Sequence, residues 1–243
     1  TLFQRTRGAA AGQHPYSGGW QSQPALSVVV SGLPAGAPEF CEVDPSEDLA
    51  RVAAVRQALG PNAKLMVDVN CAWSPDFAIE MGRAMEAQKL YWIEEPVATD
   101  DIDGSARVAD ALATPISGYE TENGLYGFRQ LIDRGAVDIV QPDIAWSGGF
   151  SEGRRIAAYA QAHHKMVAPH AFAGAVLLVA SLHFAAAIPN GLLLEWDQNP
   201  NGLRDELLKE PLRLEPDGTV KLPERPGLGI ELDPSVVERY RTG

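Results

Sequence analysis

From residue 45 onward, short apolar runs alternate with longer runs of helical length, and this alternation restricts the folds open to the chain. Examples of the apolar runs are KLMVDVN (64–70) and KLYWIEE (89–95), and examples of the helical runs are FAIEMGRAMEAQ (77–88) and AVLLVASLHFAAA (175–187). Strands that alternate with helices of this length form parallel β-α-β units. Six such strands are recognisable, so we expect an α/β fold with a parallel sheet.

The first 44 residues are less regular. Two short runs have strand character, at 26–32 and 39–44, and the segment GLPAGAP (32–38) between them has the composition of a loop. With 243 residues, 45% of them hydrophobic, the chain can build one large core. We therefore predict a (β/α)8 TIM-type barrel that is incomplete or irregular over its first two strands. Residues 1–44 form an irregular N-terminal segment in this interpretation, and 45–243 form the barrel domain with a C-terminal tail.

A polar residue stands at the C-terminal end of each of the six clear strands. Consecutive members are 23 to 27 residues apart, which is about one strand plus one helix; they are Asp68, Glu94, Glu120, Asp143, His170 and Glu195. In barrels of this class the C-terminal ends of the strands meet at one face, and that face carries the active site. We therefore expect the six side chains to form a ring at the barrel mouth.

The first three members of the ring, Asp68, Glu94 and Glu120, are carboxylates. Converging carboxylates repel one another strongly unless a cation lies between them. Because all three offer oxygen, a hard cation is favoured, Mg²⁺ before others. Asn70 lies two residues beyond Asp68 and is a candidate for binding substrate or a ligand residue. Glu95 is expected to point away from the ring or to lie in the following loop.

The other three members of the ring provide a reaction centre. Asp143 and His170 belong to neighbouring strands, and a carboxylate beside an imidazole orients it and raises its basicity, as a general base requires. Glu195, on the last clear strand, faces the opposite half of the mouth. If protonated, Glu195 donates a hydrogen bond to an oxyanion.

At these residues the chain resembles the enolase superfamily, specifically its mandelate racemase and acid-sugar dehydratase branch. The resemblance covers roughly residues 45–243 and is carried by six motifs in order: VDVN (67–70), WIEEP (92–96), GYETENGLYGF (118–128), QPDIAWSGG (141–149), APHAF (168–172) and LEWD (194–197).

The resemblance implies Mg²⁺ ligands at Asp68, Glu94 and Glu120, a His170–Asp143 dyad as base, and Glu195 near the substrate carboxylate or enolate. It also implies a reaction that starts by removing the proton α to a carboxylate. In dehydratases a β-hydroxyl then leaves. We therefore expect a Mg²⁺-dependent lyase that converts an acid sugar into a 2-keto-3-deoxy acid.

Two departures from the family keep other functions open. The family usually carries a Lys-x-Lys pair on the second barrel strand as a base on the other face of the substrate, but the first lysine here is Lys64, and the expected region reads APEFCEVD (37–44). Residues 1–44 are also too short for the family's N-terminal capping domain, which we expect to be absent. The alternatives are a catalytically impaired or inactive metal-binding barrel, or a racemase or epimerase. A metal-assisted hydrolase is disfavoured, because that class usually places histidines on the metal.

Charge and cysteine content bear on partners and compartment. The net charge of −12 disfavours binding to nucleic acid and to anionic membranes. Two cysteines, Cys41 and Cys71, are too few for a disulfide scaffold, so a reducing, cytoplasmic location is expected. No apolar run reaches the roughly 18 residues of a membrane span. We expect a small-molecule carboxylate substrate, an acid sugar, and a homo-oligomeric protein.

Overall fold

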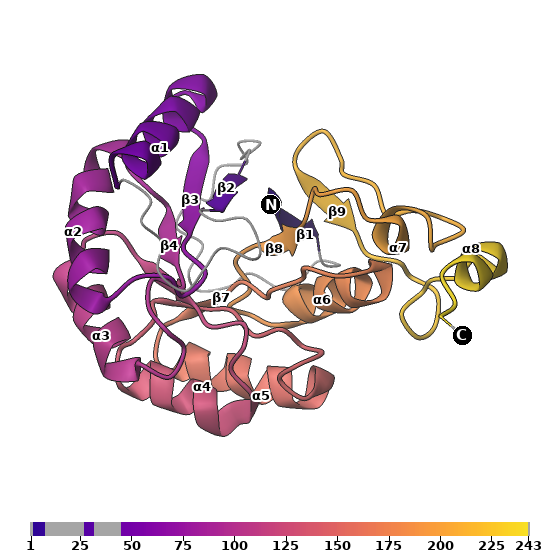
Figure 1. The fold of residues 1–243 in the computed structure, drawn as a ribbon. Coiled ribbons are helices and arrows are strands. Elements are labelled where there is room, and N and C mark those ends of the chain that lie inside the picture. Colours follow the sequence, from indigo (N-terminus) through magenta and orange to yellow (C-terminus); the bar gives the residue numbers. More distant parts are fainter. Residues whose placement is uncertain (1, 8–26, 32–44, 243) are drawn as a thin grey trace.

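The computed structural model describes residues 2–7, 27–31 and 45–242, and strands alternate with helices along most of this length (Figure 1). Strands β1 (Leu2–Arg7) and β2 (Ser27–Ser31) come first. The main body follows in chain order: α1 (Pro45–Leu59), β3 (Lys64–Asp68), α2 (Pro75–Met85), the 3₁₀ helix η1 (Glu86–Gln88), β4 (Trp92–Glu94), α3 (Ile102–Ala111), β5 (Ile116–Gly118), α4 (Gly124–Asp133), β6 (Ile139–Val140), α5 (Gly149–Ala162), β7 (Met166–Val167), α6 (Ala175–Ala187) and β8 (Leu194–Trp196). The C-terminal part contains α7 (Gly202–Asp205), β9 (Thr219–Lys221) and α8 (Pro234–Arg239).

Six strands form one parallel sheet in the order β2-β3-β4-β5-β6-β7. Beyond β7 the curvature continues, because the Val167 N–H donates to the Asn190 carbonyl at 2.9 Å and Val167 accepts from the Leu192 N–H at 2.8 Å. These bonds bring the segment that leads into β8 alongside β7. Strand β8 then pairs with β1 in a second sheet, of order β8-β1-β9.

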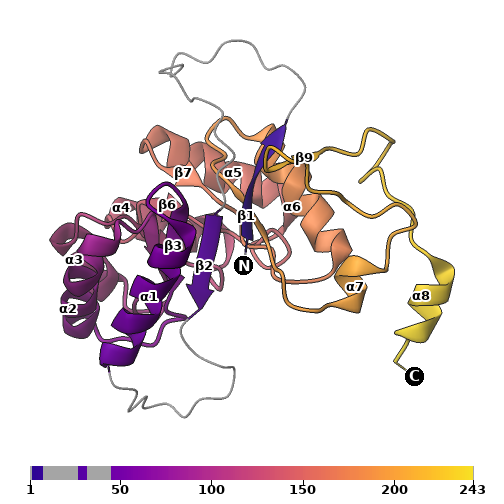
Figure 2. The same ribbon diagram turned by 90° about the horizontal axis from the view of Figure 1, so that it is seen from above.

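Helices α1 to α5 follow one another around the outside of the six-stranded sheet (Figure 1). Seen from above, β1 lies beside β2, so the second sheet brings the strand series back toward its start (Figure 2). Among the described residues no backbone ladder joins β1 to β2. The predicted α/β barrel fold is confirmed, with an interruption at this one position.

The N-terminal segment differs in part from expectation. The strand predicted at 26–32 is confirmed as β2, which pairs in parallel register with β3. The strand predicted at 39–44 lies outside the described residues. Strand β1 was not expected; it is antiparallel to β8 and parallel to β9. The division of the chain at residue 44 remains a prediction.

Side chains alternate between the two faces of the barrel strands, as extended backbone requires. On β3, Leu65 and Val67 belong to the core between strands and helices, where Phe128 of α4 and Ile156 of α5 are also buried. Met66 belongs to a second cluster inside the barrel, formed with Trp92, Ile139, Ala168 and Leu193. Residues two positions beyond this inner cluster therefore point to the interior of the barrel mouth.

Helices α2 and α3 begin at capping residues whose side chains accept from free N–H groups of the first turn. Ser74 precedes α2 and accepts from the Phe77 N–H at 3.4 Å, and Pro75 lies in the first turn. Asp101 precedes α3 and accepts from the Gly104 N–H at 2.9 Å. In the described part of the chain, none of these helices combines the length and apolar character needed to traverse a bilayer.

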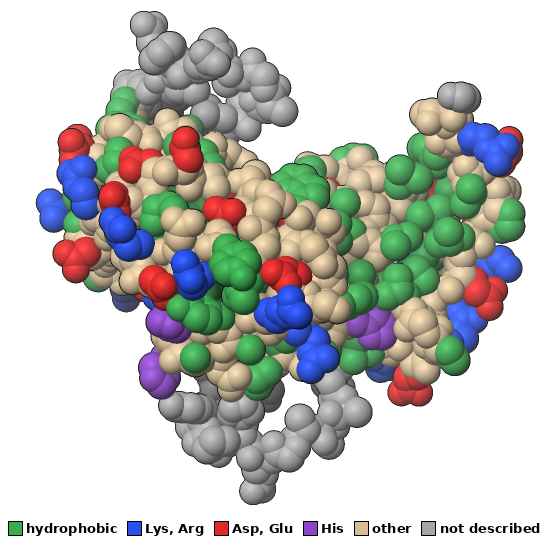
Figure 3. All heavy atoms as spheres, turned by 90° about the horizontal axis from the view of Figure 1, so that it is seen from below, with side chains coloured by type: hydrophobic (Ala, Val, Ile, Leu, Met, Phe, Trp, Pro, Cys, Tyr) green, Lys and Arg blue, Asp and Glu red, His purple; other side chains and the backbone are tan. Residues whose placement is uncertain are grey.

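On the face seen in Figure 3, basic and acidic side chains are interspersed and do not form a field of one sign. Hydrophobic side chains gather on the projecting arm formed by the C-terminal segment (Figure 3). Exposed members of this segment are Leu203, Leu214, Leu232, Val237 and Tyr240.

Candidate active site

Asp68 and Glu94 occupy the last positions of neighbouring strands and are directly paired in register. Each lies two residues beyond a member of the inner cluster, Met66 or Trp92. The Trp92 indole Nε1 donates to Glu94 Oε2 at 3.0 Å, which shows that the Glu94 carboxylate lies on the interior side. The one-per-unit recurrence therefore brings two of the predicted metal ligands side by side.

His170 follows β7 and is held by Asp143, which follows β6. Their Nδ1 and Oδ2 atoms are 2.8 Å apart, and both side chains are buried. The second oxygen of Asp143 accepts from the backbone N–H groups of Ala145 at 2.7 Å and Trp146 at 3.3 Å. These bonds fix the carboxylate, so the imidazole is fixed as well. Nε2 remains directed toward the barrel mouth.

Two carboxylates face His170 Nε2. Glu120 Oε2 lies 3.3 Å away and Glu195 Oε2 lies 3.8 Å away. Burial lowers the pKa of His170, but the hydrogen bond to Asp143 and the charges of Glu195 and Glu120 outweigh burial and raise the pKa to about 9. Without a cation nearby, the site therefore favours the imidazolium.

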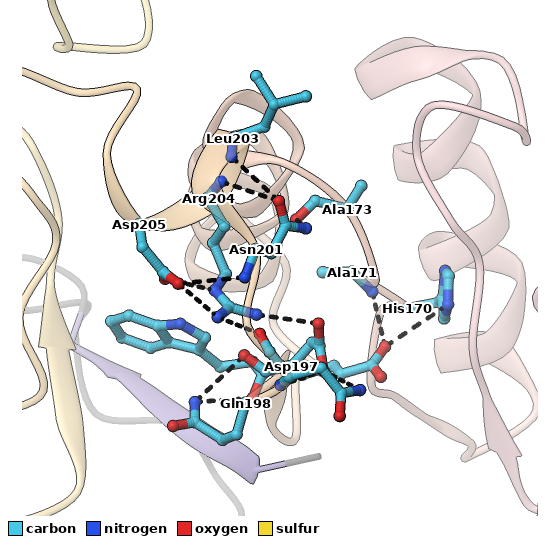
Figure 4. Close-up of polar contacts among 12 residues, drawn as sticks. His170, Ala171, Ala173, Asp197, Gln198, Asn201, Leu203, Arg204 and Asp205 are labelled. Carbon is cyan, nitrogen blue, oxygen red and sulfur yellow. Dashed lines mark hydrogen bonds and ion pairs between the residues drawn. The ribbon is translucent and has the colours of Figure 1, made fainter. Parts of the chain in front are cut away.

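Glu195 is the second residue of β8 and is nearly fully buried. Its Oε2 accepts from the Ala171 N–H at 2.7 Å, which ties β8 to the loop after β7 (Figure 4). Burial raises the pKa of Glu195 above its ordinary value, although the charge of His170 opposes this effect. A raised pKa favours the protonated form of this carboxyl group.

Burial raises the pKa of each of the three predicted metal ligands, Asp68, Glu94 and Glu120. Burial raises the pKa of Glu94 well above its usual value, and the charge of Asp68 adds to the effect. Burial also raises the pKa of Glu120, to about 8, although His170 opposes it. Among the described residues no three acidic, histidine or cysteine side chains are drawn together tightly enough to enclose a metal ion as they stand. The donor set of Asp68, Glu94 and Glu120 consists of oxygens alone, which is the chemistry that a hard cation prefers.

Asn70 lies beside Asp68 and directs both of its donors at that side chain. The Asn70 backbone N–H donates to Oδ1 at 3.0 Å, and Nδ2 donates to Oδ2 at 2.8 Å. Asn70 takes a left-handed backbone conformation, with φ 50°. The structure thus shows it holding a predicted metal ligand, and its predicted contact with substrate stays a prediction.

Sequence reasoning did not foresee the role of the residues after β8. The Arg204 guanidinium is buried and donates to Asp197 Oδ2 at 2.9 Å and to Asp205 Oδ1 at 2.8 Å; Figure 4 shows it between the two carboxylates. It also donates to the Asn199 carbonyl at 2.6 Å. This cluster fastens the loop that follows Glu195. The sequence contained a signal for this cluster: Asp197 lies two residues beyond Glu195, the spacing of side chains on one side of an extended backbone.

The family model described as "Enolase C-terminal domain-like" matches residues 24–236, and the chain belongs to this family. Its relatives lie in the mandelate racemase and acid-sugar dehydratase branch of the enolase superfamily, as the motifs predict. Arabinonate dehydratase of Saccharolobus solfataricus is 39% identical over 195 residues, which are 80% of this chain and 52% of that protein. The chain thus spans about half the length of the curated relatives it matches.

Solved structures show the same architecture. The 3,6-anhydro-D-galactonate cycloisomerase from Zobellia galactanivorans superposes with a TM-score of 0.80 at 35% identity, covering 90% of this chain and 59% of that one. L-Talarate dehydratase from Polaromonas sp. JS666, solved with Mg and L-glucarate, gives a TM-score of 0.75 at 32% identity, covering 90% of this chain and 55% of that one.

Proposed function

We propose that this chain forms the catalytic barrel of a Mg²⁺-dependent acid-sugar dehydratase. The observation that carries the proposal is the His170 imidazole, which is held by Asp143 on Nδ1 while Nε2 faces Glu120 and Glu195. The similarity to arabinonate dehydratase and to the L-talarate dehydratase complex supports the substrate class. Since the chain spans about half of such relatives, the activity of the whole protein, its substrate and its partners all belong to the proposal.

Asp68, Glu94 and Glu120 are the residues that would hold Mg²⁺ in this proposal. Held there, the ion would supply positive charge that stabilises the negative charge developing when the α proton leaves. The burial of Glu94 and Glu120 supports this role: it raises the pKa of both carboxyl groups, and a cation held between them would favour their ionised forms. Asn70 steadies Asp68 through its two hydrogen bonds.

His170 accepts the α proton at Nε2, and Asp143 keeps the ring oriented while it does so. To act as a base, His170 must be neutral, and a cation at the carboxylate trio would lower its pKa toward that state. Glu195, protonated, donates a hydrogen bond to the developing oxyanion. The bond from the β-carbon to its hydroxyl oxygen then breaks, the hydroxyl leaves as water after taking up a proton, and the enol product tautomerises to the 2-keto-3-deoxy acid.

Strand β2, the neighbour of β3 in the sheet, favours this one-base reaction over racemisation or epimerisation; the region 37–44, where the sequence suggested the second barrel strand, lies outside the described residues. Strand β2 pairs with β3 so that Ser31 is opposite Asp68, and its sequence Ser-Val-Val-Val-Ser contains no basic side chain. A two-base reaction requires a base on the other face of the substrate. A barrel that binds metal without turnover is the other candidate, and a direct assay separates the two.

Incubation with candidate acid sugars and Mg²⁺ in D₂O tests the proposal. We expect deuterium at the α-carbon or a 2-keto product, with one configuration at that carbon and not with its epimer. Comparable exchange of both epimers would indicate a two-base racemase. Mg²⁺ binding without exchange on any acid sugar would indicate the inactive barrel. A homo-oligomeric, cytoplasmic protein that binds neither nucleic acid nor membranes remains part of the proposal.

A further inference from the structure

Glu95 is a second buried carboxylate next to the proposed Mg²⁺ ligand Glu94, and the reaction as described does not use it. It directly follows β4, has a left-handed backbone with φ 42°, and is only 4% exposed. Both the backbone conformation and the burial of a carboxylate cost free energy. A buried leucine would avoid the second cost, so the acidic side chain calls for a specific physical reason.

The contacts of Glu95 supply that reason, because they join the C-terminal ends of three neighbouring strands. On the β5 side, Oε1 accepts from the Glu120 N–H at 3.0 Å, and the Glu95 N–H donates to the Ser117 carbonyl at 3.0 Å. On the β3 side, the Glu95 carbonyl accepts from the Cys71 N–H at 2.8 Å, and Oε2 accepts from Cys71 Sγ at 3.5 Å. One residue thus connects the segments that carry Asp68, Glu94 and Glu120.

The contact with Glu120 matters most for the site. Asp68 and Glu94 end strands whose ladder already fixes their register. Glu120 lies two residues beyond the end of β5, where no ladder holds the backbone. The carboxylate of Glu95 accepts the N–H of Glu120 itself, so it holds the Cα from which the third ligand side chain extends. Each oxygen of Glu95 has a partner outside the proposed ligand set or on its backbone: Oε1 accepts from the Glu120 N–H and Oε2 from Cys71 Sγ.

We propose that Glu95 is a positioning residue that sets the place of Glu120 relative to Asp68 and Glu94. The inference rests on the proposed Mg²⁺ site and deepens it. Partners that orient ligand residues typically change metal affinity by roughly 10- to 100-fold when removed. The acceptor oxygen, and not the charge, is the feature that does the positioning.

Mg²⁺ titration calorimetry on the full chain tests the inference with Glu95→Leu and Glu95→Gln. The leucine fills the space without an acceptor, so we expect Mg²⁺ binding about 10- to 100-fold weaker than in the wild type. The glutamine retains an acceptor oxygen for the Glu120 N–H, so we expect affinity within a few-fold of the wild type. If the leucine variant does not fold, Glu95→Asp replaces it, because the shorter side chain cannot reach the same N–H.

Glu152→Leu is the matched control. Glu152 Oε1 accepts from the Leu125 N–H at 2.9 Å, also a bond from a carboxylate to a backbone N–H, but it joins the first turns of α5 and α4 and holds no ligand residue. We expect its Mg²⁺ affinity to equal that of the wild type.

Unchanged affinity in Glu95→Leu, or equal losses in Glu95→Leu and Glu95→Gln, would overturn the positioning role alone. Absence of Mg²⁺ binding by the wild type would overturn the metal site and the positioning role together. A purely structural contribution of Glu95 would lower the melting midpoint in EDTA and leave the affinity unchanged, which counts against the inference.

Discussion

The hydrogen bond between His170 Nδ1 and Asp143 Oδ2 determines which imidazole nitrogen is free to accept a proton. Nε2 faces the mouth, where Glu120 and Glu195 also converge. A general base contributes roughly 10²- to 10⁴-fold to rate. The effect of His170 and Asp143 on the reaction rate can therefore be measured separately from the effect of the proposed ligands on Mg²⁺ binding.

His170→Asn is expected to abolish turnover and to leave Mg²⁺ binding intact, because His170 is not among the proposed ligands. Asp143→Asn should lower turnover as well, since it disturbs the orientation and basicity of the ring. Steady-state rates and Mg²⁺ titrations measure the two effects separately. If His170→Asn removed metal binding while the fold survived, His170 would be a ligand and the dehydratase proposal would be wrong.

The pKa of His170 predicts how the stability of the metal-free protein depends on pH. The folded-state pKa is about 9, against an ordinary value of 6.5. Between these values the folded chain retains a proton that the unfolded chain releases, so the stabilising contribution is complete below about pH 6.5 and is lost as pH rises through about 9. Glu120, with its pKa raised from 4.5 to about 8, acts in the same direction from about pH 4.5 upward.

Urea unfolding in EDTA at several pH values between about 6 and 9 measures this dependence. The free energy of unfolding should fall as the pH rises, and the fall should be shallower in His170→Asn. A free energy that stays level or increases over this range would contradict the predicted protonation of the site.

At the scale of elements, β1 is the strand that completes the environment of β8. Its residues Leu2, Phe3 and Gln4 pair with Trp196, Glu195 and Leu194. Strand β8 carries Glu195, so the N-terminal segment supports the strand that presents a proposed catalytic residue. Proline cannot donate to a ladder, and successive N–H groups along β1 point to opposite edges.

Phe3 and Gln4 are successive residues, so only one of them directs its N–H toward β8. Replacing that residue by proline (Phe3→Pro or Gln4→Pro) should remove a backbone hydrogen bond to β8 and lower the free energy of unfolding by about 1–3 kcal/mol. Gln4→Val, which keeps its N–H, is the control and should unfold like the wild type. Urea titrations compare the three. Wild-type stability in both proline variants would show that β1 does not pair with β8 in solution.

At the scale of the whole molecule, the carboxylates at the strand ends link metal binding to global stability. Asp68, Glu94 and Glu120 repel one another when no cation is present, and a ligand that binds only the folded state stabilises it by mass action. Excess Mg²⁺ should therefore raise the melting midpoint above that in EDTA. Glu94→Gln should erase the difference. Identical midpoints in wild-type protein with and without Mg²⁺ would count against the site.

The sequence alone determined the repeating strand-helix units and the polar residue at the end of each strand. Both are local patterns: burial on one side imposes a period of two on a strand and about 3.6 on a helix, and a parallel sheet sends every strand end to the same face. From these patterns the barrel class and the convergence of His170 with Asp143, Glu120 and Glu195 could be anticipated. The family followed from the resemblance of six sequence motifs.

Only the tertiary structure decided which distant segments complete these units. The run LFQRTR has weak strand character by itself, and it becomes β1 because the edges of β8 and β9, which lie far away in the chain, offer it partners. Likewise, no local pattern shows that Asn70 donates to Asp68, or that Glu95 accepts the N–H of Glu120. Hydrogen bonds of this kind depend on backbone positions that the packed barrel sets, and the periodicity of the sequence does not indicate them.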